Sequence, residues 1–239
     1  MSVERLDWLV EQSKDLKGIG NGRVLMHLCC APCAEFPVML LRQEGFEIDG
    51  LYYNPNIHPL EEWQLRLENV KRFSELKDMQ IYVDESFMEE KWRNHPSAKK
   101  KDHCAMCYFM RLDFAAKFAA EHGYAAFTTS LFVSPYQNHE AMNRSAEQAA
   151  KRYGVRFLKR DFRDGFRLGQ EMAKQDELYC QKYCGCIFSL GETRYEKKLR
   201  KRFNLAAEDL PRRETEAPLA SQGPKEISVA RVASASAHK

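Results

Sequence analysis

The sequence predicts an α/β domain in which helices cover both faces of a mostly parallel β-sheet. Short apolar runs alternate with helical segments of about ten or more residues, as strands linked by helical crossovers do. The chain has 239 residues, of which 44% are hydrophobic and 30% charged, so it can bury a substantial core. Its eight cysteines fall into three short groups. Such grouping favours metal or redox sites over a scattered disulfide framework.

Five apolar runs are the predicted strands, namely 24–28, 48–53, 81–83, 125–131 and 155–158. Helices are predicted over 35–42, from Pro59 through Phe73, and over 104–120, 138–153 and 167–178, whereas 84–103 reads as polar and irregular. This order implies right-handed βαβ units in a Rossmann-like arrangement. Ligands of such sheets bind at the carboxyl ends of the strands, and the first cysteine group begins where the first strand ends.

The chain divides into a catalytic α/β domain over 1–203 and a tail over 204–239. Prolines, serines and alanines without apolar periodicity predict disorder in this tail. No run of about 18 apolar residues is present, and the first segment does not resemble a secretory signal. We therefore expect a cytoplasmic protein without a membrane partner. The formal charge of +3 is compatible with a nucleic-acid partner but does not require one.

Two cysteine groups have the spacing of metal ligands. Cys104 and Cys107 stand three residues apart at the start of a predicted helix, where both sulfurs face one side. Cys29 and Cys30 are adjacent at a strand end, so both reach one metal only if the chain turns before Pro32. These four could hold one iron–sulfur cluster, and Cys33 could replace one of them or bind a second metal. A structural zinc site explains the spacing equally well.

The third group contains two thiols separated by a single glycine, Cys184-Gly185-Cys186. A disulfide between them would close a very small, strained ring, and strain makes a disulfide easy to reduce. This pattern favours a redox role for the pair. The alternative is a further pair of metal ligands.

Five motifs occur in a fixed order along the chain. They are His27-Leu28-Cys29-Cys30-Ala31-Pro32-Cys33, Tyr53-Asn54-Pro55-Asn56-Ile57-His58-Pro59, Cys104-Ala105-Met106-Cys107-Tyr108 with Arg111-Leu112, Thr128-Thr129-Ser130-Leu131 with Ser134-Pro135-Tyr136-Gln137, and Tyr183-Cys184-Gly185-Cys186. Together they resemble the cobalamin-independent epoxyqueuosine reductases, over about residues 24–189. Five motifs in one order are far more specific than any single Cys-x-x-Cys.

The resemblance implies an enzyme that reduces epoxyqueuosine to queuosine at the wobble position of tRNA, the last step of queuosine biosynthesis. It implies a 4Fe–4S cluster on Cys29, Cys30, Cys104 and Cys107, and a redox-active disulfide at Cys184 and Cys186. It also implies a second, mononuclear iron without assigning its ligands, for which Cys33 and Cys180 are the spare thiols. The expected partners are tRNA carrying epoxyqueuosine in its anticodon loop and an electron donor that the sequence does not identify.

The residue chemistry is compatible with that reaction. Reducing an epoxide to an alkene takes two electrons and two protons, and no dinucleotide-binding Gly-x-Gly-x-x-Gly follows a strand. The candidate general acids are His27, His58, Tyr136 and His139, although His27 on a buried strand is more often a hydrogen-bonded core residue. The basic segments 99–101 and 197–202 are expected to contact RNA.

Two other functions remain open at this point. A tRNA thiolation enzyme would be expected to carry a phosphate loop of the Ser-Gly-Gly-x-Asp-Ser type after the first strand, where this chain has Cys29-Cys30-Ala31-Pro32-Cys33. A zinc-stabilised RNA-binding module would explain metal ligands and basic segments but not the Cys-Gly-Cys pair. Iron with acid-labile sulfide favours the reductase, whereas stoichiometric zinc in colourless protein favours the binding module.

Overall fold

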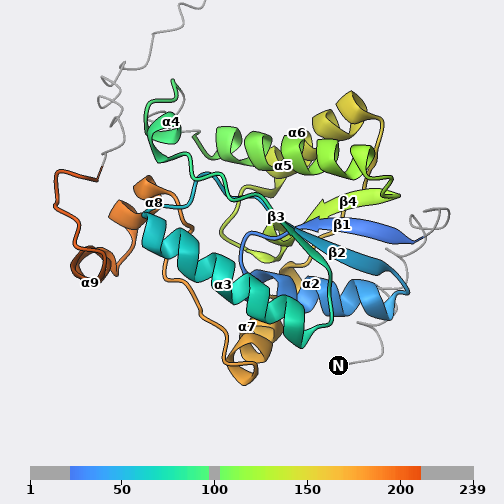
Figure 1. The fold of residues 1–239 in the computed structure, drawn as a ribbon, viewed down its shortest axis with the longest axis horizontal. Helices are drawn as coiled ribbons and strands as arrows, with labels where there is room; N and C mark the ends of the chain where they lie inside the picture. Colours follow the sequence, from blue (N-terminus) through green and yellow to red (C-terminus); the bar gives the residue numbers. More distant parts are fainter. Residues whose placement is uncertain (1–21, 97–102, 211–239) are drawn as a thin grey trace, which may run out of the picture.

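The centre of the molecule is a five-stranded parallel sheet (Figure 1). The structure is a computed structural model and describes residues 22–96 and 103–210. From edge to edge the strands are β3 (Ile81–Val83), β2 (Glu47–Tyr52), β1 (Arg23–His27), β4 (Ala126–Thr129) and β5 (Arg156–Phe157). Each pair of neighbours runs parallel. The predicted α/β fold is therefore confirmed, and all five predicted strands are present.

Helices cover both faces of the sheet. One face carries α2 (Ala31–Gln43), α3 (Leu60–Leu76) and α7 (Phe166–Gln175), and the other carries α5 (His103–Glu121) and α6 (His139–Tyr153) (Figure 1). The apolar face predicted for α3 is buried, including Trp63 and Phe73. The boundaries of α6 agree with its sequence, since Asn138 caps the amino end and Gly154, at φ +66°, ends the helix.

The path of the chain across the sheet reverses between β1 and β4. From β1 the chain winds outward through β2 to β3, and it then returns through α5 to β4 on the other side of β1. The segments that follow β1 and β4 therefore leave toward opposite faces. A crevice at such a reversal point is the usual ligand site of open parallel sheets. The residues placed there are Cys29 after β1 and Ser130 after β4.

Several element boundaries differ from the sequence expectations. The first helix begins at Ala31, four residues before the expected start, because Pro32 is tolerated in a first helical turn. The run 125–131 is a strand only to Thr129 and then turns into a 3₁₀ segment, Ser130–Val133. The region 84–103, expected to be irregular, contains the short helix α4 (Glu89–Arg93) and the first residue of α5.

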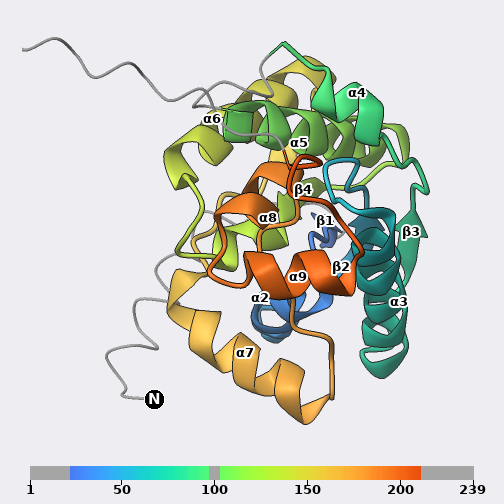
Figure 2. The same cartoon turned by 90° about the vertical axis from the view of Figure 1, so that its left-hand side faces the viewer.

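The last described part of the chain lies in front of the strands in Figure 2. It contains α8 (Ile187–Glu192) and α9 (Glu196–Arg202), neither of which the sequence predicted. A separate hydrophobic cluster joins Leu190 of α8 and Leu199 of α9, and Leu205 and Leu210 pack against it. The remainder of the predicted tail, 211–239, and the basic segment 99–101 lie outside the described residues. No helix in the described ranges has the length and apolar character that crossing a membrane requires.

Candidate metal and redox site

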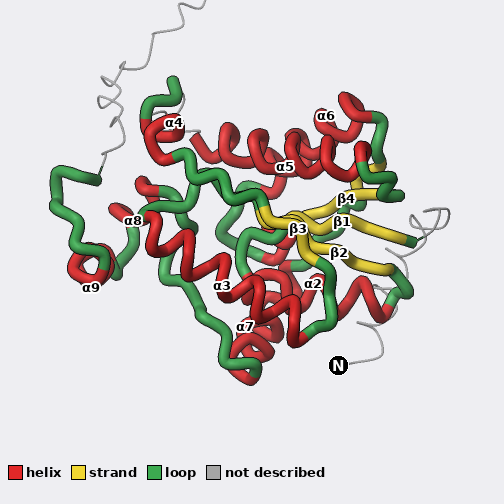
Figure 3. Tube along the Cα trace, in the orientation of Figure 1, coloured by secondary structure: helices red, strands yellow, loops and turns green. Residues whose placement is uncertain are grey.

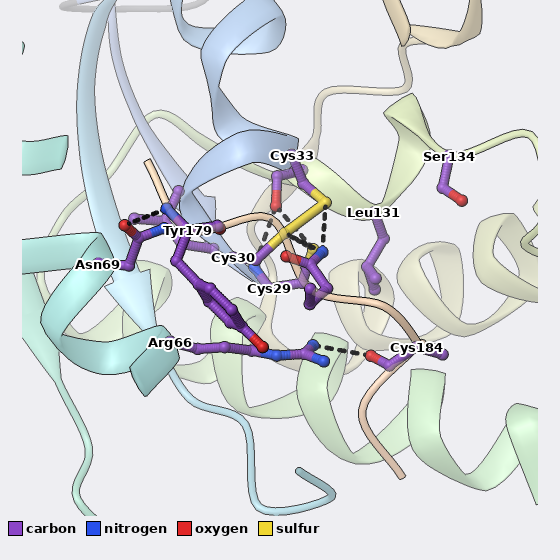
Figure 4. Close-up of a disulfide and its surroundings, with 12 residues drawn as sticks. Cys29, Cys30, Cys33, Arg66, Asn69, Leu131, Ser134, Tyr179 and Cys184 are labelled. Carbon is purple, nitrogen blue, oxygen red and sulfur yellow. Dashed lines mark hydrogen bonds between the residues drawn. A yellow bond between two sulfur atoms is a disulfide. The ribbon is translucent and has the colours of Figure 1, made fainter. Parts of the chain in front are cut away.

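Three cysteine sulfurs meet where β1 passes into α2. The Sγ atoms of Cys29, Cys30 and Cys33 lie within 4.8 Å of one another, and all three residues are buried (Figure 4). The turn that the sequence requires is present, because Cys30 is the extended amino-terminal cap of α2 and Cys33 lies in its first turn. Three soft sulfur donors at this spacing could hold a metal ion. The structure thus places Cys33, a spare thiol in the sequence analysis, directly beside Cys29 and Cys30.

Cys30 and Cys33 are joined by a disulfide, while Cys29 is a free thiol. The side-chain amide of Gln181 reaches this pair from the segment before α8, with its Nε2 at 2.9 Å from Cys30 Sγ and 3.7 Å from Cys33 Sγ. A cysteine binds a metal through its thiolate form. Cys30 and Cys33 can therefore ligate a metal only after two electrons have opened the disulfide.

Ser130 holds the remaining free thiol of this group. Its hydroxyl accepts a hydrogen bond from the Cys29 backbone amide at 3.0 Å and lies 3.3 Å from Cys29 Sγ. Burial raises the pKa of the Cys29 thiol, whereas Ser130 and the guanidinium of Arg111 oppose that rise. A metal that binds here must therefore displace a tightly held proton.

The second predicted ligand pair lies at the amino end of α5. Cys107 is buried and Cys104 is half-buried, and neither belongs to the close group formed by Cys29, Cys30 and Cys33. Arg111, one turn further along α5, donates to Cys107 Sγ at 2.8 Å and to its carbonyl oxygen at 3.2 Å. The four predicted cluster ligands thus form two separate groups, one on β1–α2 and one on α5.

Arg111 electrostatically links the two groups. Its guanidinium is buried, and burial lowers its pKa, but thiolates at Cys107, Cys184 and Cys29 outweigh this effect and hold the pKa above its ordinary value. No carboxylate is among the described groups that raise this pKa. A buried charge needs a partner of opposite sign. The buried charge of Arg111 therefore favours cysteine thiolates at this site.

The Cys184-Gly185-Cys186 segment is fixed mainly through its backbone. Arg66 of α3 donates to the carbonyl oxygens of Cys184 at 2.8 Å and Tyr183 at 3.0 Å, and the His58 amide donates to the Gly185 carbonyl at 2.8 Å. The loop from α7 to α8 runs alongside α3 for this reason (Figure 3). Gly185 has φ +132°, and a Cβ there would lie 2.9 Å from Arg66 Nη1. Only glycine fits between the two thiols.

Cys184 and Cys186 are both free thiols but differ in exposure. Cys184 is exposed, with the Gln137 side-chain amide 3.5 Å from its sulfur. Cys186 is buried and caps α8, accepting from the Ser189 amide at 3.4 Å. Its sulfur also lies 4.0 Å from His103 Nε2, which is 3.8 Å from Cys104 Sγ. Cys184 and Cys186 are thus not joined by a disulfide in this structure, and one thiol is open to solvent while the other faces the α5 group.

Arg66 owes its own position to a buried ion pair with Glu62. The Arg66 Nε atom lies 2.8 Å from Glu62 Oε1, and both side chains are at most 2% exposed. Replacing Glu62 by Gln leaves a buried guanidinium without its counter-charge, so we expect the free energy of unfolding to fall by about 3 kcal/mol. Urea denaturation of the two proteins measures the difference.

The exposed ion pair between Arg72, also on α3, and Glu177, which follows α7, offers a matched control. Its side chains are 49% and 82% exposed, so Glu177→Gln is expected to cost less than about 1 kcal/mol. Equal losses in Glu62→Gln and Glu177→Gln would contradict a structural role for the buried pair.

The four candidate proton donors have very different surroundings. Both ring nitrogens of His27 are bonded, to the Thr129 hydroxyl and the Tyr53 carbonyl, and burial lowers its pKa to about 3. His27 is therefore a neutral core residue at neutral pH. His139 bonds the Ser134 carbonyl and supports the loop before α6. Tyr136 is exposed, and His58 is buried with its pKa lowered to about 3 by burial and by Arg93.

The β2–α3 loop contains buried polar atoms without partners in the described ranges. They are Asn54 Oδ1, both amide atoms of Asn56 and both ring nitrogens of His58. The Asn54 side chain donates to the Leu28 carbonyl, which places the loop beside the start of the cysteine group. Unsatisfied buried polar atoms are rare, and their explanations include an ordered water, a bound ion and a catalytic role.

These observations fit a thiolate-bound metal group. Several soft donors converge, no carboxylate is among the described groups that raise the pKa of buried Arg111, and polar atoms of the β2–α3 loop have no partner in the described ranges. Iron–sulfur and zinc chemistry both satisfy them. Cys180 lies apart from the close group, with its sulfur 3.6 Å from the Leu178 carbonyl. Sequence reasoning did not identify Arg66, Ser130 or Gln181 as supports of the sulfur atoms, although Ser130 lies within a quoted motif.

Comparisons with known proteins match the part of the chain that contains these cysteines. The model of the family described as epoxyqueuosine reductase QueH matches residues 24–192, a range that includes all eight cysteines. The chain is 38% identical over 167 residues to the epoxyqueuosine reductase QueH of Dehalococcoides mccartyi, covering 70% of this chain and 92% of that protein. It is 34% identical to the protein of that name from Acinetobacter baylyi, covering 72% of this chain and 82% of the relative. For Thermotoga maritima the identity is 32%, with 72% and 93% covered.

Proposed function

Because the chain belongs to the epoxyqueuosine reductase QueH family, we propose that it reduces epoxyqueuosine to queuosine in tRNA through the cysteine site described above. It is an oxidoreductase that acts at the last step of queuosine biosynthesis. The observation that carries the proposal is the family match across the whole site, from Cys29 to Cys186. The catalytic domain is assigned to residues 1–203, and the substrate is tRNA that carries epoxyqueuosine at the wobble position.

The Cys184 and Cys186 thiols can balance the reaction. The epoxide gains two electrons and two protons, its two C–O bonds break, an alkene forms and the oxygen leaves as water. The two thiols lose two protons and two electrons and become a disulfide. Exposed Cys184 is the thiol that a large RNA substrate can reach, and Gln137 orients it. An external electron donor must then reopen the disulfide before the next turnover.

Cys29, Cys30, Cys104 and Cys107 would hold the 4Fe–4S cluster. When bound, such a cluster supplies electrons one at a time. Gln181, Ser130 and Arg111 each place a polar group against a sulfur of this set, and such contacts stabilise thiolate charge. Cys33 stands close enough to Cys29 and Cys30 to serve a second, mononuclear iron, and Cys180 is the other candidate for it.

The function is tested by the nucleosides of tRNA from a strain that lacks the gene. Epoxyqueuosine should accumulate, queuosine should disappear, and a plasmid copy of the wild-type gene should restore queuosine. Purified protein with a chemical reductant should convert epoxyqueuosine in isolated tRNA. Normal queuosine levels in the deletion strain, with no conversion by anaerobically prepared protein, would contradict the proposal.

The exposed lysines of α9 are expected to contact tRNA phosphates. Arg200 is paired with Glu196, and Arg202 lies over the rings of Tyr179 and Phe203, whereas Lys198 and Lys201 are exposed. The double variant Lys198→Glu/Lys201→Glu should weaken tRNA binding. The slope of log K against log salt should become shallower by about one for each phosphate that the protein no longer neutralises.

A charge-matched control uses the opposite edge of the sheet. Lys117 and Lys151 are exposed near the carboxyl ends of α5 and α6, which lie at the amino ends of the strands. Lys117→Glu/Lys151→Glu makes the same change in net charge. An equal change of slope in both double variants would show a general charge effect and would remove α9 from the interface.

A further inference from the structure

The most exposed large apolar or aromatic side chain in the described ranges belongs to Tyr136. Its exposed fraction is 83%, against 51% for Leu76, the next most exposed. Single exposed apolar residues are common on protein surfaces. The position of Tyr136, between β4 and α6 at the carboxyl edge of the sheet, is what distinguishes it.

The loop that carries Tyr136 is held on both sides. The Tyr136 amide donates to the Ser134 hydroxyl at 3.3 Å, and His139 Nε2 lies 2.9 Å from the Ser134 carbonyl oxygen. On the other side the Tyr108 hydroxyl donates to Gln137 Oε1 at 2.8 Å and accepts from the Asn138 amide at 3.1 Å. The ring is therefore displayed by a fixed loop, which lowers the entropy lost when a ligand binds to it.

The same loop contacts the exposed redox thiol. Gln137, the next residue, places its side-chain amide 3.5 Å from Cys184 Sγ. Tyr136 is thus one residue from a group in contact with the only cysteine that is exposed in the described part of the chain. A substrate that reacts at Cys184 must therefore approach the loop that carries this ring.

The Tyr136 ring packs against the ring of Phe166, and this contact leaves one of its faces free for stacking. Phe166, at the start of α7, lies with its ring centre 5.9 Å from that of Tyr136 and at 84° to it. In an edge-to-face contact of this kind, Tyr136 uses an edge or a single face. At least one face of the Tyr136 ring is therefore free. Arg167, the residue after Phe166, is an exposed cation.

We propose that Tyr136 is the platform on which an unpaired base of the tRNA anticodon loop stacks while the modified nucleoside reaches Cys184. The inference rests on the proposed function, which supplies an anticodon loop as substrate. Single-stranded bases are held by aromatic stacking together with nearby cations. Tyr136 supplies the ring, on the loop whose next residue contacts Cys184, and the exposed cation Arg167 follows Phe166, the ring that packs against Tyr136.

The test measures binding of a fluorescently labelled, unmodified anticodon stem-loop by anisotropy. Tyr136→Ala should weaken binding roughly 5- to 150-fold, the range that corresponds to loss of one stacked base. Tyr136→Phe should bind within about twofold of the wild type, because stacking uses the ring and not the hydroxyl. In turnover of tRNA containing epoxyqueuosine, Tyr136→Ala should raise KM far more than it lowers kcat.

Leu76→Ala is the matched control, since Leu76 is also exposed but lies at the end of α3, away from the cysteines. It should bind the stem-loop like the wild type. Wild-type affinity in Tyr136→Ala would overturn the proposal, and so would a loss in Tyr136→Phe equal to that in Tyr136→Ala. A wild-type protein that binds the stem-loop but never reduces epoxyqueuosine would instead contradict the proposed function and leave the stacking result standing on its own.

Discussion

Replacing Cys30 or Cys107 by serine should remove iron, acid-labile sulfide and activity together. The two residues come from the two separate sulfur groups, and both are buried, so solvent cannot easily take the place of a missing ligand. Serine is a poor ligand for an iron–sulfur cluster, which takes four thiolates. Iron and sulfide analysis of anaerobically purified variants measures the effect. Full iron and sulfide in either variant would show that the ligand assignment is wrong.

Cys33→Ser sharpens this experiment because the structure places Cys33 next to Cys29 and Cys30. If Cys29, Cys30, Cys104 and Cys107 hold the cluster, Cys33→Ser keeps the acid-labile sulfide. Loss of sulfide in Cys33→Ser, with sulfide retained in Cys104→Ser, would show that Cys33 is a cluster ligand in place of Cys104. Far-UV circular dichroism separates either result from simple unfolding.

Cys184→Ser should keep the full content of iron and sulfide but lose multiple turnover. Cys184 is exposed, whereas Cys30 and Cys107 are buried, and Cys184 is not one of the four proposed cluster ligands. Without its sulfur the pair with Cys186 cannot close to a disulfide, and two electrons are missing from each cycle. Product per enzyme, measured with excess tRNA and reductant, gives the result.

The same variant serves as the control for the cysteine-to-serine change in Cys30→Ser and Cys107→Ser. Loss of the cluster in Cys184→Ser would make Cys184 a metal ligand. Normal multiple turnover would show that the Cys184 and Cys186 pair takes no part in the reaction.

Features that depend on local sequence could be predicted well. The apolar runs identified all five strands, and Asn138 and Gly154 marked both ends of α6, because caps and strand runs are set by neighbouring residues. The short helices α4 and α8 could not be predicted. Each has six residues or fewer, too few to show a helical period, and is stabilised by packing against other elements.

The sequence indicated the three cysteine groups, but it did not indicate the residues that contact their sulfur atoms. Ser130 and Gln181 lie 101 and 151 residues away from the cysteines that they contact, so only the folded sheet brings them together. Glu62 and Arg66 have the i, i+4 spacing of a helical ion pair, yet such pairs are usually on the surface. Their burial follows from the α7–α8 segment that lies over α3, which no local pattern predicts.

The buried guanidinium of Arg111 has a consequence for the lifetime of the protein. Burial raises the pKa of Cys107 and of Cys29, so without a bound metal the thiolates that balance the buried Arg111 cation are disfavoured. We expect a chain without the metal to be less stable than a metal-loaded one and to open more often. In a cell, open chains are the ones that proteases remove. On the proposed metal-bound state, Arg111 would thus tie the abundance of the protein to the supply of that metal, through selective clearance of chains that were never loaded.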